Sequence, residues 1–271
     1  MKTMKNFKFL TVAVFASVLT IVSCSKEDEP VPATIVVAAP VETCTDHFDY
    51  ENPNNWSHVC TTNNTPNECG STYRQSPIDI VGAVADATLP ILSPIYSSSS
   101  TDIVNNGHTI QFNYNGAASD FTFGGETYSL LQFHFHASSE HTFGGTHQAL
   151  EGHLVHASPS GSLAVIAVFF ELGAANPFLD QFTANLPSHA GDTYVDVNLN
   201  YAPEDLFPVN QSYYNYNGSL TTPPCSDIVN WIVMEHTSTA SQAQLDAFTT
   251  LLHSNYRPVQ PLSGRTIKHK I

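Results

Sequence analysis

Gln132-Phe133-His134-Phe135-His136, followed along the chain by Glu151-Gly152-His153, is the stretch that decides the fold of this sequence. Polar and apolar residues alternate in it, as they do in a β-strand with one buried face. Successive strand side chains point to opposite faces, so the two phenylalanines face a core while His134 and His136 project from the other side. A neighbouring strand over the second segment would add His153. The sequence therefore predicts two paired strands that bring three imidazoles together.

Three converging imidazoles form a ligand set for a metal ion. Zn²⁺ binds neutral imidazole nitrogen, and catalytic zinc sites use three protein ligands and leave the fourth position to water or substrate. A single buried histidine is more often a core residue with satisfied hydrogen bonds, and a His-x-His pair alone favours that reading. Adding His153 makes a zinc site and a core cluster equally good interpretations, and by itself indicates no reaction.

The remaining pattern predicts a β-dominated α+β domain with a few peripheral helices. Three segments alternate polar and apolar residues and predict half-buried strands, namely residues 109–114, 126–135 and 192–199. The continuous apolar run 163–172 predicts a strand buried on both faces. Asn-Gly and Gly-Gly pairs between such segments indicate turns. A helix is predicted over residues 241–252 with Ser241 as its cap, and a second short helix over residues 177–186.

Residues 1–23 predict a secretory signal peptide. Three lysines precede an apolar run, residues 9–22, which is short for a membrane span. The run ends in Ile21-Val22-Ser23-Cys24, which resembles the cleavage box of a bacterial lipoprotein, so lipidation of Cys24 is expected. An ordinary signal peptide with a cysteine nearby is the alternative.

Residues 24–43 predict a flexible, lipid-anchored tether, and residues 44–271 predict one domain with a single large core. The tether is charged at its start, then rich in Pro, Val and Ala, and has no amphipathic period. Several acyl chains on Cys24 would hold the protein firmly on a membrane. Ser25 after the lipidated cysteine resembles an outer-membrane sorting signal, so the predicted location is the bacterial outer membrane, on its periplasmic or cell-surface side.

The charge balance excludes some partners. The chain carries 9 Lys+Arg against 24 Asp+Glu, a formal net charge of −15. This acidity argues against nucleic acid, and against anionic membrane surfaces as electrostatic partners. Contact with a membrane is therefore expected through the lipid on Cys24 only, and the sequence does not indicate an oligomeric state.

The cysteine count fits an exported protein. With Cys24 assigned to lipid, four cysteines remain, namely Cys44, Cys60, Cys69 and Cys225, and they allow three pairings. An exported domain is expected to oxidise them, and free buried thiols are the alternative.

Seven short strings follow one another along the chain and are specific as a set. They are Arg74-Gln75-Ser76-Pro77-Ile78, Asn105-Asn106-Gly107-His108, Gln132-Phe133-His134-Phe135-His136, Ser139-Glu140-His141-Thr142, Glu151-Gly152-His153-Leu154-Val155-His156, Ser219-Leu220-Thr221-Thr222-Pro223-Pro224 and Asn255-Tyr256-Arg257-Pro258-Val259-Gln260-Pro261-Leu262. By these strings the chain is identified as a member of the α-class carbonic anhydrases, of the bacterial, exported lipoprotein type. The resemblance runs from about His47 to Ile267.

The resemblance implies a fold and a reaction. The fold is a single domain with a central, mostly antiparallel twisted sheet of about ten strands and peripheral short helices. The reaction is the zinc-dependent, reversible hydration of carbon dioxide to bicarbonate and a proton, the lyase activity of a carbonate dehydratase. His134, His136 and His153 fall on the zinc ligands, zinc-bound hydroxide attacks the carbon, and His108 matches the histidine that shuttles the proton to buffer.

Further positions follow from the same resemblance. Thr221 and Glu140 match the pair that orients the hydroxide, because the threonine hydroxyl donates to the carboxylate and accepts from the nucleophile. The Thr221 backbone N–H would steady the substrate, and Thr222 matches a neighbouring position in the cleft. An apolar wall for carbon dioxide, which core packing alone could also explain, falls on Val155, Val165, Leu220, Val229 and Trp231.

The resemblance also assigns supporting groups around the zinc ligands, whose second ring nitrogen must be held. Their matching partners are Gln132 for His134, Glu151 for His153 and the backbone carbonyl of Asn255 for His136. Polar positions that organise water near the shuttle fall on Tyr50, Asn106 and Gln111. A disulfide between Cys69 and Cys225 is implied beside the Thr221 loop, which leaves Cys44 to pair with Cys60.

Two other classes of protein are compatible with parts of the sequence. The spacing His134-x-His136-x₃-Glu140 also resembles the first metal motif of a cupin. A Pro-x-Gly turn does follow, at Pro159-Ser160-Gly161, but the histidine and asparagine that a cupin needs after it do not. A non-catalytic binding module related to carbonic anhydrases would lose zinc histidines, and this chain keeps all three together with Thr221 and His108. Both are weaker than the enzyme interpretation.

Overall fold

The predicted strand pair around the histidines is present. Strand β6 (Glu126–His136) runs antiparallel to β9 (Leu150–Ala157), with His134 opposite His153 and His136 opposite Glu151. The computed structural model describes residues 44–62, 66–117 and 119–271, which belong to one compact unit. The predicted signal peptide, the tether and Cys24 lie outside the described residues.

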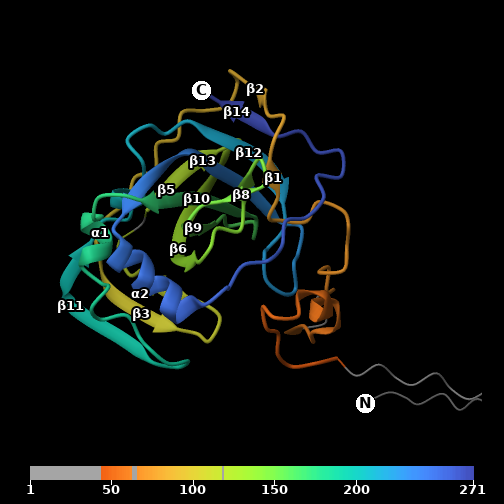
Figure 1. The fold of residues 1–271 in the computed structure, drawn as a ribbon. Helices are drawn as coiled ribbons and strands as arrows, with labels where there is room; N and C mark the ends of the chain where they lie inside the picture. Colours follow the sequence, from red (N-terminus) through yellow and green to blue (C-terminus); the bar gives the residue numbers. More distant parts are fainter. Residues whose placement is uncertain (1–43, 63–65, 118) are drawn as a thin grey trace, which may run out of the picture. The chain divides into compact units, whose positions relative to one another are not determined.

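Strands β6 and β9 stand in the middle of a large sheet (Figure 1). In the described part of the chain this sheet has 11 strands in the order β11-β3-β4-β6-β9-β10-β13-β12-β14-β2, with β5 added beside β6. The further strands are β2 (Val84–Ala85), β3 (Ser99–Asn105), β4 (Ile110–Asn113), β5 (Asp120–Phe123), β10 (Leu163–Leu172), β11 (Thr193–Tyr201), β12 (Tyr213–Gly218), β13 (Val229–Ala240) and β14 (Lys268–Lys270). Two pairs, β10 with β13 and β14 with β2, are parallel and the others antiparallel. The predicted fold class is confirmed.

A small second sheet lies beside the first. It consists of β1 (Asp79–Ile80), β7 (Thr142–Phe143) and β8 (Thr146–His147). Two tight turns close hairpins at predicted Gly-Gly pairs, with Gly124-Gly125 between β5 and β6 and Gly144-Gly145 between β7 and β8. All four glycines have positive φ, which side-chain-bearing residues rarely adopt, so these turns depend on glycine.

Both faces of the sheet carry an apolar core, and β10 shows the division. Ile166, Val168 and Phe170 belong to the larger core, while alternate residues such as Val165 and Phe169 belong to the smaller one. Phe133 and Phe135 are fully buried in the larger core, as predicted. His153 is paired with Ala167, a residue of the smaller core, so the histidines project on that side.

The predicted burial of β10 fails at its last two residues. Residues 164–170 are buried, but Glu171 and Leu172 are exposed. The reason is that β9 pairs only as far as Phe170, so these residues have a neighbouring strand on one side, β13.

The predicted helices are both present, one of them shorter than expected. Helix α2 (Gln242–Leu252) begins at Ser241, whose side chain and that of Gln244 form a reciprocal capping box. Helix α1 (Pro177–Asp180) stops after one turn, and the chain to residue 185 continues in tight turns whose backbone hydrogen bonds reach three or four residues back. The structure also has the 3₁₀ segments η1 (Pro53–His58) and η3 (Pro203–Leu206). Among the described residues, no helix is long and apolar enough to cross a membrane.

Strand β9 also buries a titratable side chain in the larger core. His156 is fully buried, with Nδ1 3.2 Å from the Ala164 carbonyl oxygen and Nε2 2.8 Å from the Tyr96 hydroxyl. Because a carbonyl only accepts, Nδ1 carries the proton in this bond and Nε2 accepts from Tyr96. Burial lowers the pKa of His156 to about 4, against opposing contributions from backbone hydrogen bonds and Asp120.

We predict that His156 makes the protein less stable at acidic pH. Its folded pKa lies below the unfolded value, so the unfolded chain takes up the proton first as the pH falls. Between pH 7 and 4 this group should lower the free energy of unfolding by about 3 kcal/mol. Denaturant titrations across this range should show that the free energy of unfolding falls less in His156→Gln than in the wild type as the pH is lowered. The control His189→Gln, at an exposed histidine, should follow the wild type. The same dependence of the free energy of unfolding on pH in all three proteins would contradict the prediction.

Candidate metal centre and active site

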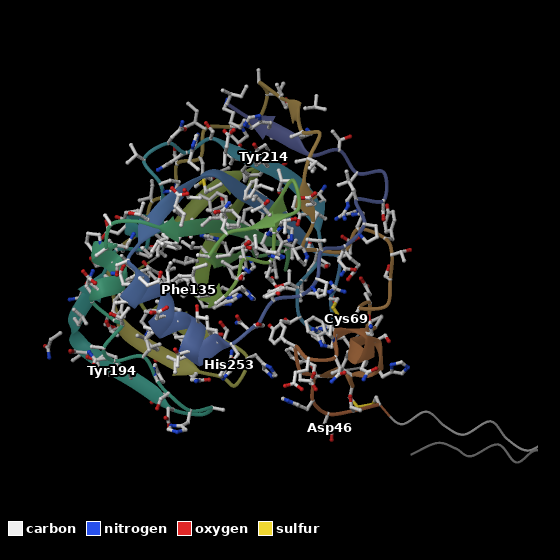
Figure 2. The ribbon with its side chains drawn as sticks, viewed as in Figure 1. Asp46, Cys69, Phe135, Tyr194, Tyr214 and His253 are labelled. Carbon is white, nitrogen blue, oxygen red and sulfur yellow. A yellow bond between two sulfur atoms is a disulfide. The ribbon has the colours of Figure 1, made fainter. Side chains whose placement is uncertain are left out.

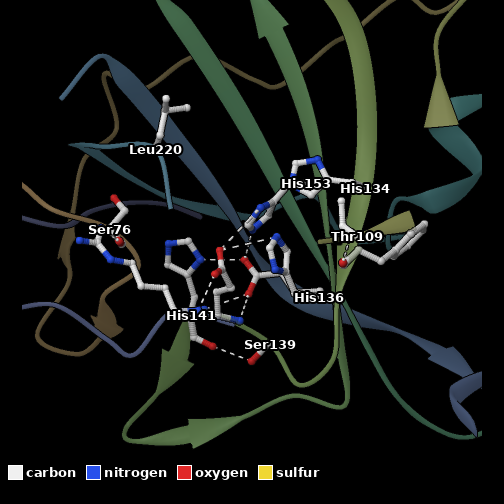
Figure 3. Close-up of polar contacts among 12 residues, drawn as sticks. Ser76, Thr109, His134, His136, Ser139, His141, His153 and Leu220 are labelled. Carbon is white, nitrogen blue, oxygen red and sulfur yellow. Dashed lines mark hydrogen bonds and ion pairs between the residues drawn. The ribbon is translucent and has the colours of Figure 1, made fainter. Parts of the chain in front are cut away.

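Three imidazoles meet where β6 and β9 pair (Figure 3). The ring centroids are 5.1 Å apart for His134 and His136, 5.3 Å for His134 and His153, and 4.6 Å for His136 and His153. One nitrogen of each ring lies within 4.8 Å of the others. The convergence that strand alternation predicted is therefore present in the structure.

Each of these rings has one nitrogen held and one nitrogen free. The Nδ1 atoms of His134 and His136 donate to Gln132 Oε1 and to the Asn255 carbonyl, at 2.9 and 2.7 Å. His153 instead uses Nε2, which donates to Glu151 Oε1 at 2.7 Å. The nitrogens left over are Nε2 of His134 and His136 and Nδ1 of His153. His136 Nε2 and His153 Nδ1 lie 3.7 and 4.0 Å from the same Glu140 oxygen, and His136 Nε2 is buried without a hydrogen-bond partner among the described residues. This donor set fits a zinc ion.

Two of the imidazoles, those of His134 and His136, are shifted toward the neutral form that a metal requires. Burial, followed by the neighbouring imidazoles of His136 and His153, lowers the pKa of His134 well below its ordinary value. Burial also lowers the pKa of His136, although the Glu140 carboxylate opposes the shift. Neutral rings keep a lone pair on the free nitrogen.

Glu151 is a buried carboxylate with four hydrogen-bond donors. Its Oε1 accepts from His141 Nδ1 and His153 Nε2, both at 2.7 Å, and its Oε2 accepts from the backbone N–H groups of Glu140 and His141. Burial by itself would raise the pKa of Glu151, but the two imidazoles and their hydrogen bonds hold it below its ordinary value. The charged form is therefore the one that orients His153.

Glu140 points a free carboxylate oxygen at the histidines. It is fully buried, and its Oε1 accepts from the Arg257 backbone N–H at 2.8 Å. Its Oε2 has no hydrogen-bond partner among the described residues and lies 3.7 Å from His136 Nε2. Thr221 is buried in the loop after β12, but no hydrogen bond of the described residues joins it to Glu140. The orienting pair therefore stays a prediction.

The five apolar residues of the predicted wall gather in the smaller core. Val165, Val229 and Trp231 are buried there, and Val155 and Leu220 pack against them. The Trp231 ring lies 4.9 Å from that of His153, measured between centroids. An apolar surface thus adjoins the centre, although core packing alone would also bury these side chains.

A cavity of ≈ 770 Å³ opens beside the centre. Its lining includes residues 47–51, residues 107–109 and the end of α2 with His253, which Figure 2 labels. Tyr50, His108 and Asn255 are among the residues that line it, whereas the three histidines of the centre are not. Burial, and then the negative charge of Glu140, raises the pKa of Tyr50 well above its ordinary value, so the phenol stays protonated.

His108 stands in the wall of this cavity, half-buried. Burial, and then the nearby His47, lowers the pKa of His108 from its ordinary value. Asn106 accepts from the backbone N–H groups of His108 and Thr109, each at 2.9 Å, so its oxygen shapes the turn. The Gln111 amide donates to Asn113. The water-organising roles predicted for Asn106 and Gln111 stay predictions.

With this geometry in view, the similarity to known proteins is informative. A family model described as "Eukaryotic-type carbonic anhydrase" matches residues 51–271. The chain belongs to this family. The α-class assignment made from the seven strings is confirmed, while the lipoprotein type depends on residues outside the described part.

Relatives and solved structures agree on the family. A carbonic anhydrase from Klebsiella pneumoniae is 41% identical over 237 residues, which cover 84% of this chain and 93% of the relative. One from Pectobacterium atrosepticum is 39% identical over 224 residues, covering 82% and 91%. The α-carbonic anhydrase of Thermovibrio ammonificans, solved with the inhibitor sulfanilamide, superposes with a TM-score of 0.74 at 39% identity, covering 80% and 94%.

The sequence suggested no role for one buried histidine of the site, His141. His141 Nε2 lies 2.7 Å from the Tyr216 hydroxyl, which donates to Ser76 Oγ, and Ser76 Oγ accepts from the Ser219 N–H. A polar chain thus runs from Glu151 through His141 to Ser219, two residues before Thr221. All of its members except Tyr216 lie in the seven strings, but because they come from four separate segments, the strings did not show that they form a chain.

Two disulfides are present, in the pairs given above. Cys69 bonds to Cys225 and Cys44 to Cys60. Cys225 ends the Thr221-Thr222-Pro223-Pro224 loop, and its carbonyl accepts from the Gln75 side chain. The Cys69 carbonyl accepts from Arg257, whose backbone N–H holds Glu140. This disulfide thus ties the Thr221 loop to the segment that supports the centre.

We predict that the variant Cys69→Ser/Cys225→Ser loses both stability and activity. The bond closes a loop with a sequence separation of 156, and losing such a bond should lower the free energy of unfolding on the order of 4 kcal/mol. The loosened Thr221 loop should also lower kcat/KM for carbon dioxide. Thermal melting and stopped-flow hydration test both effects, and a variant with wild-type Tm and rate would show that the bond does not hold the loop.

Proposed function

We propose that this chain catalyses the zinc-dependent, reversible hydration of carbon dioxide to bicarbonate and a proton. One observation carries the proposal: three imidazoles, each with one nitrogen held by the protein, bring one nitrogen apiece within 4.8 Å of one another. Membership of the carbonic anhydrase family supports this reaction above other uses of a histidine-bound zinc. His134, His136 and His153 would hold the ion.

A bound zinc ion lowers the pKa of its water to about 7 and so supplies a hydroxide nucleophile at neutral pH. The protein must then hold carbon dioxide, which is linear and has no net charge. The apolar wall of Val165, Val229 and Trp231 suits it, because apolar surface beside the centre offers no hydrogen bond that would retain bicarbonate.

Thr221 and Glu140 would position the nucleophile. The Arg257 N–H holds Glu140 Oε1, so the unpaired Oε2 is available to accept from the Thr221 hydroxyl. Once the threonine proton is committed to Glu140, the threonine oxygen can only accept a hydrogen bond. The nucleophile that donates to it keeps its lone pair directed at carbon dioxide, which is a positioning effect. The Thr221 N–H and Thr222 would steady the substrate beside it.

His108 would carry the proton away. It lines the open cavity, within reach of solvent, and burial keeps its pKa below the ordinary value. A neutral ring nitrogen can accept a proton through bridging water and release it to buffer. Tyr50, whose raised pKa keeps it protonated, lines the same cavity and would help to order its water.

We further propose an exported, membrane-tethered enzyme with the domain division predicted from the sequence. The two disulfides indicate an oxidising compartment and so support export. Anchoring by lipid on Cys24, the bacterial outer membrane and the tether over residues 24–43 rest on the sequence alone. Globomycin treatment of expressing cells, which blocks lipoprotein signal cleavage, should accumulate the unprocessed precursor.

We predict that the purified protein binds about one zinc ion per chain and hydrates carbon dioxide faster than buffer. Chelation should abolish the activity and lower the Tm, because the free imidazole nitrogens lose their common partner, and added zinc should restore both. Stopped-flow hydration, with zinc measured on the same sample, tests this. His136→Ala should lose zinc and activity, whereas the exposed-site control His189→Ala should keep both. Zinc binding with no rate enhancement would identify a non-catalytic binding module instead.

We predict that His108→Ala slows proton release but not the attack on carbon dioxide. In dilute buffer kcat should fall roughly tenfold or more, while kcat/KM stays near the wild-type value. Added imidazole should restore kcat by replacing the lost proton acceptor. Failure of imidazole to restore it would remove the shuttle role from His108.

A further inference from the structure

One wall of the cavity is a covalently closed ring of chain. Cys44 and Cys60 are joined by a disulfide with Cα atoms 5.0 Å apart, which closes residues 44–60 into the N-terminal ring. Beside the bond, the Thr45 N–H donates to the His58 carbonyl at 2.9 Å and the Cys60 N–H donates to the Thr45 carbonyl at 2.8 Å. His47, Phe48 and Tyr50, which line the cavity, all belong to this ring.

The N-terminal ring has little core of its own. Within residues 44–60, all of which the structure describes, only Trp56 and Val59 are buried. The Trp56 indole N–H donates to the Asp49 carbonyl at 2.6 Å, and the Asn67 side chain donates to the carbonyls of both buried residues at 2.8 Å. Segments with so few buried contacts open locally at small cost, so the covalent bond contributes much of the order in this one.

The ring presents an aromatic face to His108. The Phe48 ring lies 4.0 Å from the His108 ring and nearly parallel to it, at 8°. Trp56 meets the same phenylalanine edge-on at 5.2 Å, and His47 lies 5.2 Å from His108. The buried Trp56 thus packs against Phe48, and Phe48 packs against the His108 imidazole.

The aromatic face is the main restraint on the His108 side chain. The His108 backbone is held by Asn106 at its N–H and by the Asn255 side chain at its carbonyl, at 2.9 and 3.0 Å. Among the described residues, no hydrogen bond reaches either nitrogen of its imidazole. Its rotation is therefore limited chiefly by the stack on Phe48.

We propose that the Cys44–Cys60 disulfide and Phe48 are positioning elements for proton transfer. The bond keeps the N-terminal ring closed, the closed ring holds Phe48 flat against His108, and the imidazole keeps one orientation in the cavity. This inference rests on the proposed role of His108 as the proton shuttle. Neither cysteine touches the three histidines of the centre, so opening the ring should leave the attack on carbon dioxide unchanged.

The test uses the full-length, zinc-loaded protein and the variant Cys44→Ser/Cys60→Ser. In dilute buffer kcat should fall roughly threefold or more, less than the about 10²-fold that gross misplacement of a reacting group can cost. kcat/KM and zinc content should match the wild type, and imidazole should restore kcat. A purely structural role for the disulfide would not produce this separation of kcat from kcat/KM.

Phe48 variants test the same idea without touching the disulfide. Phe48→Ala removes the stack and should reproduce the loss of kcat, whereas Phe48→Tyr keeps an aromatic face and should retain it. Combined with His108→Ala, Phe48→Ala should cause no further loss, because its effect passes through that imidazole. Ile91→Ala, at an exposed apolar residue that does not line the cavity, serves as the control and should behave as wild type.

The outcomes separate this inference from the proposed function. An active wild type whose kcat in dilute buffer is unchanged in Phe48→Ala would overturn the positioning role alone, as would equal losses of kcat and kcat/KM. If the cysteine variant does not fold, the Phe48 variants decide. A zinc-loaded wild type that does not hydrate carbon dioxide would overturn the proposed function, and this role with it.

Discussion

The register between β6 and β9 is the constraint on which the centre depends. It sets His134 opposite His153 and His136 opposite Glu151. A slip by one residue would turn the histidines into the larger core and bring Phe133 and Phe135 to the metal side. Because both faces of the sheet are buried at this point, such a slip would be costly on either side. The apolar packing that stabilises the fold is thus also what brings the ligands together.

The buried charge of Glu151 extends this constraint to the neighbouring loops. A buried carboxylate is tolerated only when its oxygens are satisfied, and here four donors satisfy them. Two donors are backbone N–H groups that fix the segment carrying Glu140, and His141 continues the polar chain toward Ser219. The orientation of His153 and the position of the loop before Thr221 are therefore parts of one hydrogen-bonded network enclosed by apolar side chains.

Features encoded by local periodicity could be predicted from the sequence, and features made by distant contacts could not. Alternation was enough to predict β6 and the faces of Phe133 and His134, and Ser241 marked the start of α2. The length of α1 was overestimated because tight turns follow its single helical turn. The stack of Phe48 on His108 joins two loops with no periodic pattern, so only the structure could reveal it.

The N-terminal ring has a mechanical consequence for the proposed attachment of the domain to a tether. A pull that arrives along the chain at residue 43 enters Cys44 and can cross the sulfur bridge directly into Cys60. The disulfide is a much shorter connection than the peptide between the two cysteines, so the peptide with His47 and Phe48 carries almost none of the force. A force from the membrane or from neighbouring molecules would then be transmitted to the rest of the domain without displacing the aromatic side chains packed around His108.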